Sequence, residues 1–336
     1  MKVGDKKIFS RLNIGRRRLF ATVAITSFAF GVAACGGSES SSGGGAVESE
    51  DPIVITLHDW TGQLLTSNIM AAVLEKAGYN TELVQADYLA QFAGLETGDL
   101  HLAMEIWATT GQEAMDASLA TGKTLNFGEN GMVAREEWWY PEYMKERCPG
   151  LPEWEALKKC SAEFATPETA PKGRYLGGPV TWGGFDEERV DALGLDFEVV
   201  HAGTDAALFA ELESAYERKD PIVLWIYQPH WAPVKYAGEF VEFPPYTPEC
   251  YTDPTWGSTS KAYDCGKPVG PIWKVGWAGL GEKWPGAKSI IEAFKLSNDD
   301  MGAMVAKVDL DGESLESVVD KWMADNESVW KAWIGA

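Results

Sequence analysis

The first third of the chain alternates between apolar runs with the period of a strand and segments with the apolar spacing of a helix. Residues 52–60, 81–87 and 100–107 are predicted strands. Residues 67–78 and 89–97, which separate them, are predicted helices. Strand, helix, strand, helix, strand is the pattern of a parallel sheet with crossover helices, so we expect an α/β unit here.

A second α/β unit is predicted from residue 139. After a turn-rich stretch at 174–184, residues 196–203 form a predicted strand, 205–220 an amphipathic helix, and 221–231 a strand followed by a loop. This unit also places strands and helices in alternation, which favours a second parallel arrangement.

Two later strands, at 239–246 and 271–280, are predicted to return to the first unit. The tail from 287 to 333 is mainly helical, with a helix at about 315–326. This order predicts two lobes with a ligand cleft between them. The predicted division is residues 52–138 with 235–336 in lobe I, and 139–234 in lobe II.

The N-terminal segment has the features of an export signal. Basic residues precede an apolar run at 19–34 that is too short to span a bilayer comfortably, and Cys35 follows directly. Residues 32–35 resemble a bacterial lipobox, which implies cleavage before Cys35 and an extracytoplasmic protein anchored to the membrane by lipid. Residues 1–34 are therefore the predicted signal, and the Gly- and Ser-rich residues 35–51 a flexible tether. The triple arginine fits a twin-arginine signal as well as an ordinary one.

The chain is strongly acidic, with 29 Lys+Arg against 50 Asp+Glu and a formal net charge of −21. Loss of residues 1–34 would remove seven basic residues and one acidic residue, which leaves −27. Such a charge excludes nucleic acid and anionic lipid surfaces as partners. It is compatible with a cationic ligand, and solubility in a salty habitat explains it equally well.

Four cysteines remain when Cys35 is set aside. Their even number in an exported chain predicts disulfides, and proximity favours Cys148 with Cys160 and Cys250 with Cys265 among the three possible pairings. Metal ligation is a weaker alternative, because the chain has no CxxC pair and no histidine close to these cysteines. We expect no cofactor and no functional metal.

Fifteen tryptophans are far more than a chain of this length usually carries. Core packing explains most of them. Trp60, Trp107, Trp182 and Trp231 differ, because each ends a predicted strand or lies in a loop bounded by glycine or proline. Two come from each predicted lobe, so we expect them to meet in a shared cleft.

Three segments carry a family resemblance. EIWATTG at 105–111, GGPVTWGG at 177–184 and IYQPHW at 226–231 resemble the substrate-binding proteins of ABC importers for glycine betaine, choline and related compatible solutes. The resemblance extends over nearly all of residues 52–336, and HDW at 58–60 is most like the branch for trimethylamine N-oxide and choline. It implies a two-lobed periplasmic-binding-protein-like (type II) α/β fold.

The resemblance also implies site residues and partners. Trp107, Trp182 and Trp231 would form an aromatic box around a trimethylammonium head, with Trp60 as an additional wall. A monomer would close around its ligand by a hinge and dock on a membrane permease that is energised by a separate ATPase subunit. The chemistry is reasonable, because a quaternary ammonium has no N–H and must be held by ring faces and burial of its methyl groups.

Carboxylates near these tryptophans are the next candidates. Glu105 shares the strand face of Trp107, and Glu136 matches the acid of the trimethylamine N-oxide branch. A buried acid would balance a cation or, when protonated, donate to an N-oxide oxygen. The alternative is that Glu136 and Glu137 are solvated surface charges.

A zwitterion such as glycine betaine would also need hydrogen-bond donors. The backbone around Gly183 and Gly184 is a candidate anion nest, and His230 is a candidate donor, although a loop histidine is more often solvated. Tyr227 is expected at the cleft rim. The residue Gly111, where glycine betaine binders often have histidine, weakens the case for that ligand.

Two other classes of function stay open on the sequence. A sugar-binding receptor would share the anchor, the lobes and the tryptophans, since rings also stack on sugars. A glycoside-active enzyme would use paired acids in a cleft. The chain has no GxSxG, HExxH or Walker motif, which argues against an enzyme.

Overall fold

The computed structural model describes residues 48–257 and 259–335. Cys35, the predicted signal and nearly all of the predicted tether lie outside the described residues. The described chain builds one nine-stranded sheet in the order β2-β1-β3-β9-β4-β7-β5-β6, with β8 paired to β4. No helix of this part of the chain combines the length and apolar character that a membrane span requires.

The predicted strands and helices of the first unit are confirmed. The strands are β1 (Ile53–Leu57), β2 (Thr81–Gln85) and β3 (Leu102–Trp107), and β1 pairs in parallel with the other two. The crossover helices are α1 (Thr61–Lys76) and α2 (Gln91–Thr97). All six residues of β3 are buried, which fits a strand covered on both faces.

The second unit is also parallel. Its strands are β5 (Gly173–Gly177), β6 (Phe197–His201) and β7 (Leu224–Gln228), and its helices are α6 (Asp186–Leu193) and α7 (Asp205–Arg218). Strand β5 lies in a stretch predicted only as turns, because its five residues include two glycines. The side chain of Thr204 accepts a hydrogen bond from the Ala207 N–H and caps α7.

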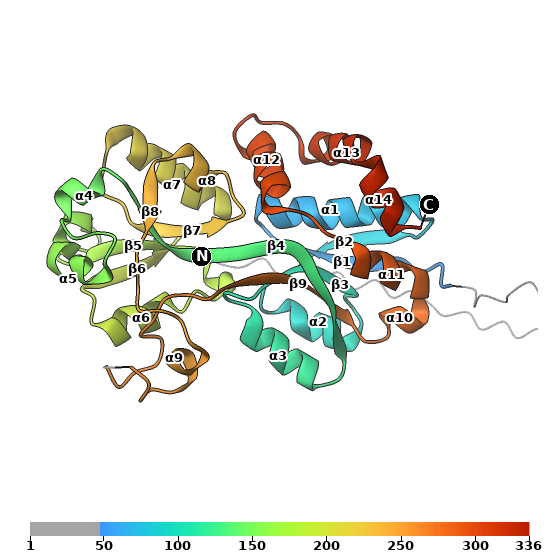
Figure 1. The fold of residues 1–336 in the computed structure, drawn as a ribbon, viewed down its shortest axis with the longest axis horizontal. Coiled ribbons are helices and arrows are strands. Elements are labelled where there is room, and N and C mark those ends of the chain that lie inside the picture. The colour runs from blue at the N-terminus through green and yellow to red at the C-terminus, as the bar shows by residue number, and fades with distance from the viewer. Residues whose placement is uncertain (1–47, 258, 336) are drawn as a thin grey trace, which may run out of the picture. The chain divides into compact units, whose positions relative to one another are not determined.

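Two long antiparallel strands join the units. Strand β4 (Thr124–Pro141) pairs with β9 (Val269–Trp277) along its first part and with β7 near its end, and β9 also pairs with β3 (Figure 1). The return of 271–280 to the first unit is therefore confirmed. The expectation for 239–246 was wrong, because only β8 (Gly238–Phe240) forms and it pairs with the end of β4 beside the second unit.

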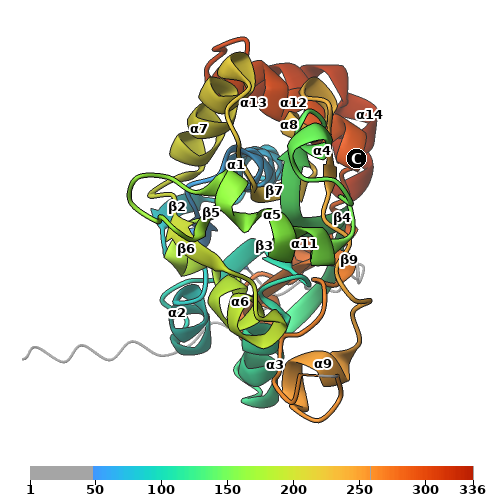
Figure 2. The same ribbon diagram turned by 90° about the vertical axis from the view of Figure 1, so that its left-hand side faces the viewer.

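Helices near the C-terminus cover the first unit. Both views show α12 (Asn298–Asp309) and α13 (Leu315–Asp325) beside α1 (Figures 1 and 2). The remaining helices are α3 (Gln112–Ala120), α4 (Met144–Arg147), α5 (Leu157–Cys160), α8 (Ala232–Lys235), α9 (Pro248–Thr252), α10 (Leu280–Lys283), α11 (Pro285–Ala293) and α14 (Glu327–Trp333). Short 3-10 turns occupy Trp154–Ala156, Ser161–Phe164 and Val180–Trp182.

One disulfide closes a loop between β4 and β5, and the other closes a loop in the connection between β8 and β9. The structure pairs Cys148 with Cys160 and Cys250 with Cys265, as proximity in the sequence favours. Trp138 and Trp139 at the end of β4 are core residues, and Trp138 stacks on Tyr175 at a centroid distance of 3.8 Å. Most of the many tryptophans therefore pack in the core.

Candidate ligand-binding site

A small cavity lies where the carboxyl ends of the strands of both units meet β4. The empty space between its walls is about 260 Å³ when the part open to solvent is included. The residues that line it are Trp60, Tyr88, Trp107, Thr110, Glu136, Trp182 and Tyr227. Five of these seven residues are aromatic.

Strand topology explains why residues so far apart in the sequence meet here. Trp60 and Tyr88 follow β1 and β2, and Trp107 ends β3, so the parallel strands deliver all three rings to one sheet edge. In the second unit, Tyr227 lies near the end of β7 and Trp182 in the turn after β5. The long strand β4 contributes Glu136 between the two groups.

The rings stand nearly at right angles to one another. Trp60 and Trp182 have centroids 5.6 Å apart and an interplanar angle of 76°. Trp107 and Tyr227 are 5.5 Å apart at 85°, and Trp182 and Tyr227 are 5.9 Å apart at 84°. Edge-to-face pairs of this kind are favourable in themselves. All four rings line the same cavity and therefore form an aromatic box around it.

Glu105 supports this cavity from beneath rather than lining it. The indole N–H groups of Trp60 and Trp107 both donate to its Oε2, at 3.1 and 2.9 Å. The Thr66 hydroxyl lies 2.5 Å from its Oε1. The side chain is 1% exposed, and burial raises the pKa of Glu105. One carboxyl group thus orients two walls.

Glu136 is the acid that reaches the cavity. It is 6% exposed, which rules out the solvated alternative, and the Thr109 hydroxyl donates to its Oε2. Burial raises the pKa of Glu136 to about 7, although the Thr109 hydrogen bond and the charge of Lys267 act in the opposite direction. Its neighbour Glu137 is buried as well and forms an ion pair with Arg189 at 2.5 Å.

The structure does not bring Trp231 to this cavity. The loop after β7 carries its ring toward Phe209 and the end of α12, where the indole N–H donates to Asp309 Oδ2 at 2.8 Å. Tyr227 stands at the cavity in its place. His230 lies beside Trp231, stacked on Phe209 at 3.9 Å, and its Nδ1 accepts the Ala232 N–H.

Gly183 and Gly184 do not line the cavity either. The Gly183 N–H donates to the Val180 carbonyl, which closes the 3-10 turn below Trp182. A Cβ on Gly184 would lie 2.3 Å from the Trp225 ring, so this glycine allows close packing behind the cavity wall. Trp225 itself is core, as expected from the sequence.

Two lining residues were not predicted from the sequence. Tyr88 follows β2 at the same sheet edge as Trp60, and its hydroxyl accepts the Trp107 backbone N–H at 2.8 Å. Thr110 belongs to the segment that carried the family resemblance. A search of the residues just after every predicted parallel strand would have found Tyr88.

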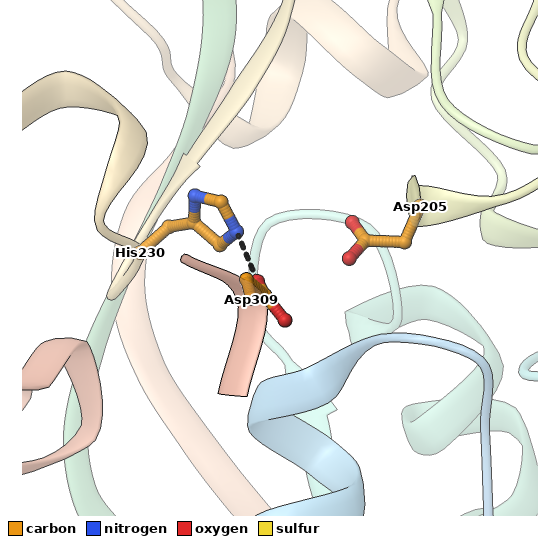
Figure 3. Close-up of side chains that lie close together, drawn as sticks. All are labelled: Asp205, His230 and Asp309. Atoms are coloured by element: carbon orange, nitrogen blue, oxygen red, sulfur yellow. Dashed lines mark ion pairs between the residues drawn. The ribbon is translucent and has the colours of Figure 1, made fainter. Parts of the chain in front are cut away.

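A buried polar cluster lies behind Tyr227. Ligand atoms of Asp205, His230 and Asp309 all lie within 4.8 Å of one another (Figure 3). Because Nδ1 of His230 accepts the Ala232 N–H, the neutral ring carries its proton on Nε2, which faces Asp309 at 3.6 Å. That nitrogen carries a hydrogen in this arrangement and therefore offers no lone pair to a metal ion.

The fold and the cavity define a two-lobed α/β binding protein with an aromatic site where its halves meet. The chain belongs to the family described as the substrate-binding domain of the ABC-type glycine betaine transport system, whose model matches residues 51–325. The protein is therefore the extracytoplasmic substrate-binding component of an ABC-type transport system for small molecules, and such a system also contains a permease and an ATPase. The relatives are transport proteins and not enzymes.

One curated relative is a trimethylamine N-oxide-binding protein of Pelagibacter ubique (strain HTCC1062). It is 35% identical over 293 residues, which cover 85% of this chain and 91% of the relative. Solved structures share the fold. The lactococcal protein OpuAC, closed on glycine betaine, has a TM-score of 0.66 at 16% identity and covers 84% of this chain and 100% of its own. A choline-binding protein with choline has a TM-score of 0.68 at 16% identity and covers 84% and 91%.

Proposed function

We propose that this protein binds a methylated onium compound in the box formed by Trp60, Trp107, Trp182 and Tyr227, with Glu136 as its polar anchor. The observation that carries the proposal is a cavity that these four rings line, with three ring pairs packed edge to face, and that contains one buried carboxyl group. A methylated onium head is compact and offers methyl groups and positive charge, which ring faces attract.

The free energies of these contacts are large enough for micromolar binding. Each desolvated cation–π contact contributes roughly 0.5 to 2 kcal/mol, and each buried methyl group about 0.8 kcal/mol. Four rings and three methyl groups therefore supply on the order of 5 to 10 kcal/mol before ordering costs. Micromolar binding corresponds to about −8 kcal/mol, so the box suffices without many hydrogen bonds.

Among onium compounds, we favour trimethylamine N-oxide. Its oxygen accepts a hydrogen bond, and Glu136 with a pKa of about 7 is protonated often enough to donate one. The similarity to a trimethylamine N-oxide-binding protein supports this choice. Glycine betaine is less favoured, because its carboxylate would need donors and the structure keeps His230, Gly183 and Gly184 away from the cavity.

A sugar is the second candidate, since tryptophan rings also stack on sugar faces. A sugar presents a hydroxyl group at almost every carbon, and each one loses its bond to water on burial. The lining residues offer Thr110 and Glu136, whereas the hydroxyl of Tyr227 is engaged by Asp205. This cavity is too poor in hydrogen-bonding groups for such a ligand.

The test is a calorimetric titration of the purified protein, from residue 36 onward, against trimethylamine N-oxide, choline, glycine betaine, carnitine, dimethylsulfoniopropionate and glucose. We expect at least one onium compound to bind and glucose not to bind. Trp107→Leu should weaken onium binding at least tenfold, and Trp256→Leu, on a half-exposed surface tryptophan, is the matched control. Absence of any onium response would end the proposal.

The pH profile distinguishes the N-oxide from a full cation. An N-oxide needs protonated Glu136, so its affinity should be complete below pH 6 and fall up to tenfold per unit above the pKa of about 7. Choline should show the reverse, since ionised Glu136 attracts it. Glu136→Gln keeps an N–H donor and should make N-oxide binding independent of pH between 5.5 and 8.5. An unchanged slope in this variant would show that another group titrates.

We also propose that the mature protein is held on the membrane by lipid on Cys35. The support is the basic segment, the apolar run and the cysteine at residues 1–35. Expression of the full chain in a bacterium should place it in the membrane fraction with a mass increase from acylation. Cys35→Ser should abolish that increase, and Cys35→Ser protein that stays acylated would contradict the anchor.

A further inference from the structure

The four tryptophans singled out in the sequence share one feature that their packing does not explain. Each donates its indole N–H to a carboxylate. Trp60 and Trp107 donate to Glu105, which belongs to the same half of the sheet. The first half is the unit that contains β1, β2 and β3, and the second half is the unit that contains β5, β6 and β7. Trp182 and Trp231 come from the second half and donate to carboxylates of the first.

The two bonds between the halves are both partly buried, and they differ in length. Trp182 Nε1 lies 3.1 Å from Oδ1 of Asp59, an exposed residue after β1. Trp231 Nε1 lies 2.8 Å from Oδ2 of Asp309, whose side chain is 19% exposed. The bond to Asp309 is the shorter of the two.

Asp309 joins several elements at once. It is the last residue of α12, and its Oδ1 accepts the hydroxyl hydrogen of Thr61, the first residue of α1, at 2.6 Å. His230 Nε2 faces Oδ2 from the other side at 3.6 Å (Figure 3). This carboxylate therefore links two helices of the first half to the loop that follows β7.

The charges around Asp309 favour its role as an acceptor. Burial tends to raise its pKa, but the nearby His230 ring and the hydrogen bonds from Thr61 and Trp231 outweigh burial and hold the pKa below the ordinary value. Asp205, also in the cluster, has a pKa raised to about 8 by burial. Near neutral pH, Asp309 is therefore ionised while Asp205 is largely neutral, which avoids repulsion between them.

We propose that Asp309, with a smaller contribution from Asp59, is the latch that holds the two halves together around the bound ligand. In this assignment Trp231 is not a wall of the box but the donor that the latch engages. Asp309 is a positioning residue, since it acts through Trp231 and the loop that follows Tyr227 and strand β7. The inference rests on the proposed function, because the latch acts on the lifetime of the ligand complex.

We expect loss of the latch to change the rate at which the ligand dissociates. A hydrogen bond to a charged group lost from a part-buried site changes an equilibrium by roughly tenfold or more. Asp309→Ala should therefore raise the dissociation rate of the onium ligand about tenfold to fiftyfold, with little change in the association rate. Asp309→Asn keeps a carbonyl oxygen that accepts the indole N–H, so it should recover most of the loss. Asp59→Ala should give a change of about threefold or less.

The experiment measures dissociation by stopped-flow fluorescence for the wild-type protein and each variant. Asp311→Ala is the matched control, since this exposed neighbour pairs with Lys307 and makes no described contact with the second half. Trp231→Phe keeps a ring and removes the N–H, and Asp309→Ala should add little to its effect. Thermal melting of each variant shows whether the fold is intact.

Two results would overturn the latch. One is an unchanged dissociation rate in folded Asp309→Ala, and the other is full additivity of Asp309→Ala with Trp231→Phe. If the wild-type protein binds no onium compound, the proposed function fails instead. The latch then remains testable by hydrogen exchange of the Trp231 indole, which should be slow in the wild-type protein and faster in Asp309→Ala. Equal exchange in the two proteins would exclude it.

Discussion

Glu105 shows how a fully buried acid is accommodated without a cation. Its Oε2 accepts two indole N–H groups, and its Oε1 lies 2.5 Å from the Thr66 hydroxyl. That hydroxyl also lies 2.8 Å from the Gly62 carbonyl, yet it has one hydrogen to donate. All groups are satisfied when protonated Glu105 donates to Thr66 and Thr66 donates to Gly62. Burial, which raises the pKa of Glu105, supports the neutral form.

We predict that Glu105→Gln preserves both folding and ligand affinity. The glutamine amide oxygen would accept the two indoles, and its NH₂ would donate to Thr66. Glu105→Ala should leave two buried donors unpaired and reduce the free energy of unfolding by about 3 kcal/mol. Thermal melting and calorimetric titration check both. If Glu105→Gln loses as much as Glu105→Ala, the acid is ionised in the native protein.

The sequence predicted the proximity of Glu105 to Trp107 but not its role. Two residues apart on a strand, they share a face, and that much follows from the period of a strand. The bond from Trp60 depends on the parallel register of β1 and β3, which a single sequence does not show. The same limit applies to Trp231, whose direction depends on a loop and on α12, about eighty residues later.

At the scale of elements, the turn between β3 and α3 packs closely against the connection between β2 and α2. Gly111 caps α3 and faces Tyr88, and a Cβ at this position would lie 2.3 Å from the tyrosine hydroxyl. That hydroxyl accepts the Trp107 backbone N–H, so the turn, the tyrosine and a wall of the cavity are coupled. A side chain at residue 111 would have to displace Tyr88.

We predict that Gly111→Ala weakens ligand binding about tenfold and destabilises the fold by about 1 to 3 kcal/mol. Tyr88→Phe removes the clashing oxygen, so the double variant should be less destabilised than the two single changes added together. Gly302→Ala is the control, because a Cβ on that helical glycine meets no atom within 4 Å. Strict additivity of Gly111→Ala and Tyr88→Phe would show that the two residues do not compete for space.

Elements with a strong hydrophobic period were predicted well from the sequence. Short elements, and elements whose burial changes along their length, were not. The strands and helices of the first unit and α7 follow the hydrophobic pattern because each buries one clear face or is buried entirely. Strand β4 was missed because buried and exposed positions alternate in its first part and all positions are buried near its end, so its eighteen residues have no single pattern. Strand β5 is short and glycine-rich, and its pairing with β6 and β7 decides its conformation.

At the scale of the whole molecule, one continuous sheet carries both halves of the site. The sequence predicted two α/β units and the return of the chain to the first. The boundaries at residues 139 and 235 remain predictions. What the sequence did not show is that β4 and β9 make the two units one sheet, and that β4 itself supplies Glu136. The site is therefore built on the connection between the units as well as on their edges.

The net charge of −21 leads to a prediction about association kinetics. A surface so acidic attracts a cation over a distance that salt shortens, since the Debye length falls from about 30 Å at 0.01 M to about 10 Å at 0.1 M. Choline carries a net positive charge, whereas trimethylamine N-oxide and glycine betaine are neutral overall. We expect the association rate of choline to fall several-fold between these two salt concentrations and that of the neutral ligands to stay nearly constant. Stopped-flow association at both concentrations, with potassium chloride and potassium glutamate as alternative salts, separates screening from specific ion binding. An equal salt dependence for choline and trimethylamine N-oxide would mean that closure of the halves, and not encounter with the charged surface, limits association.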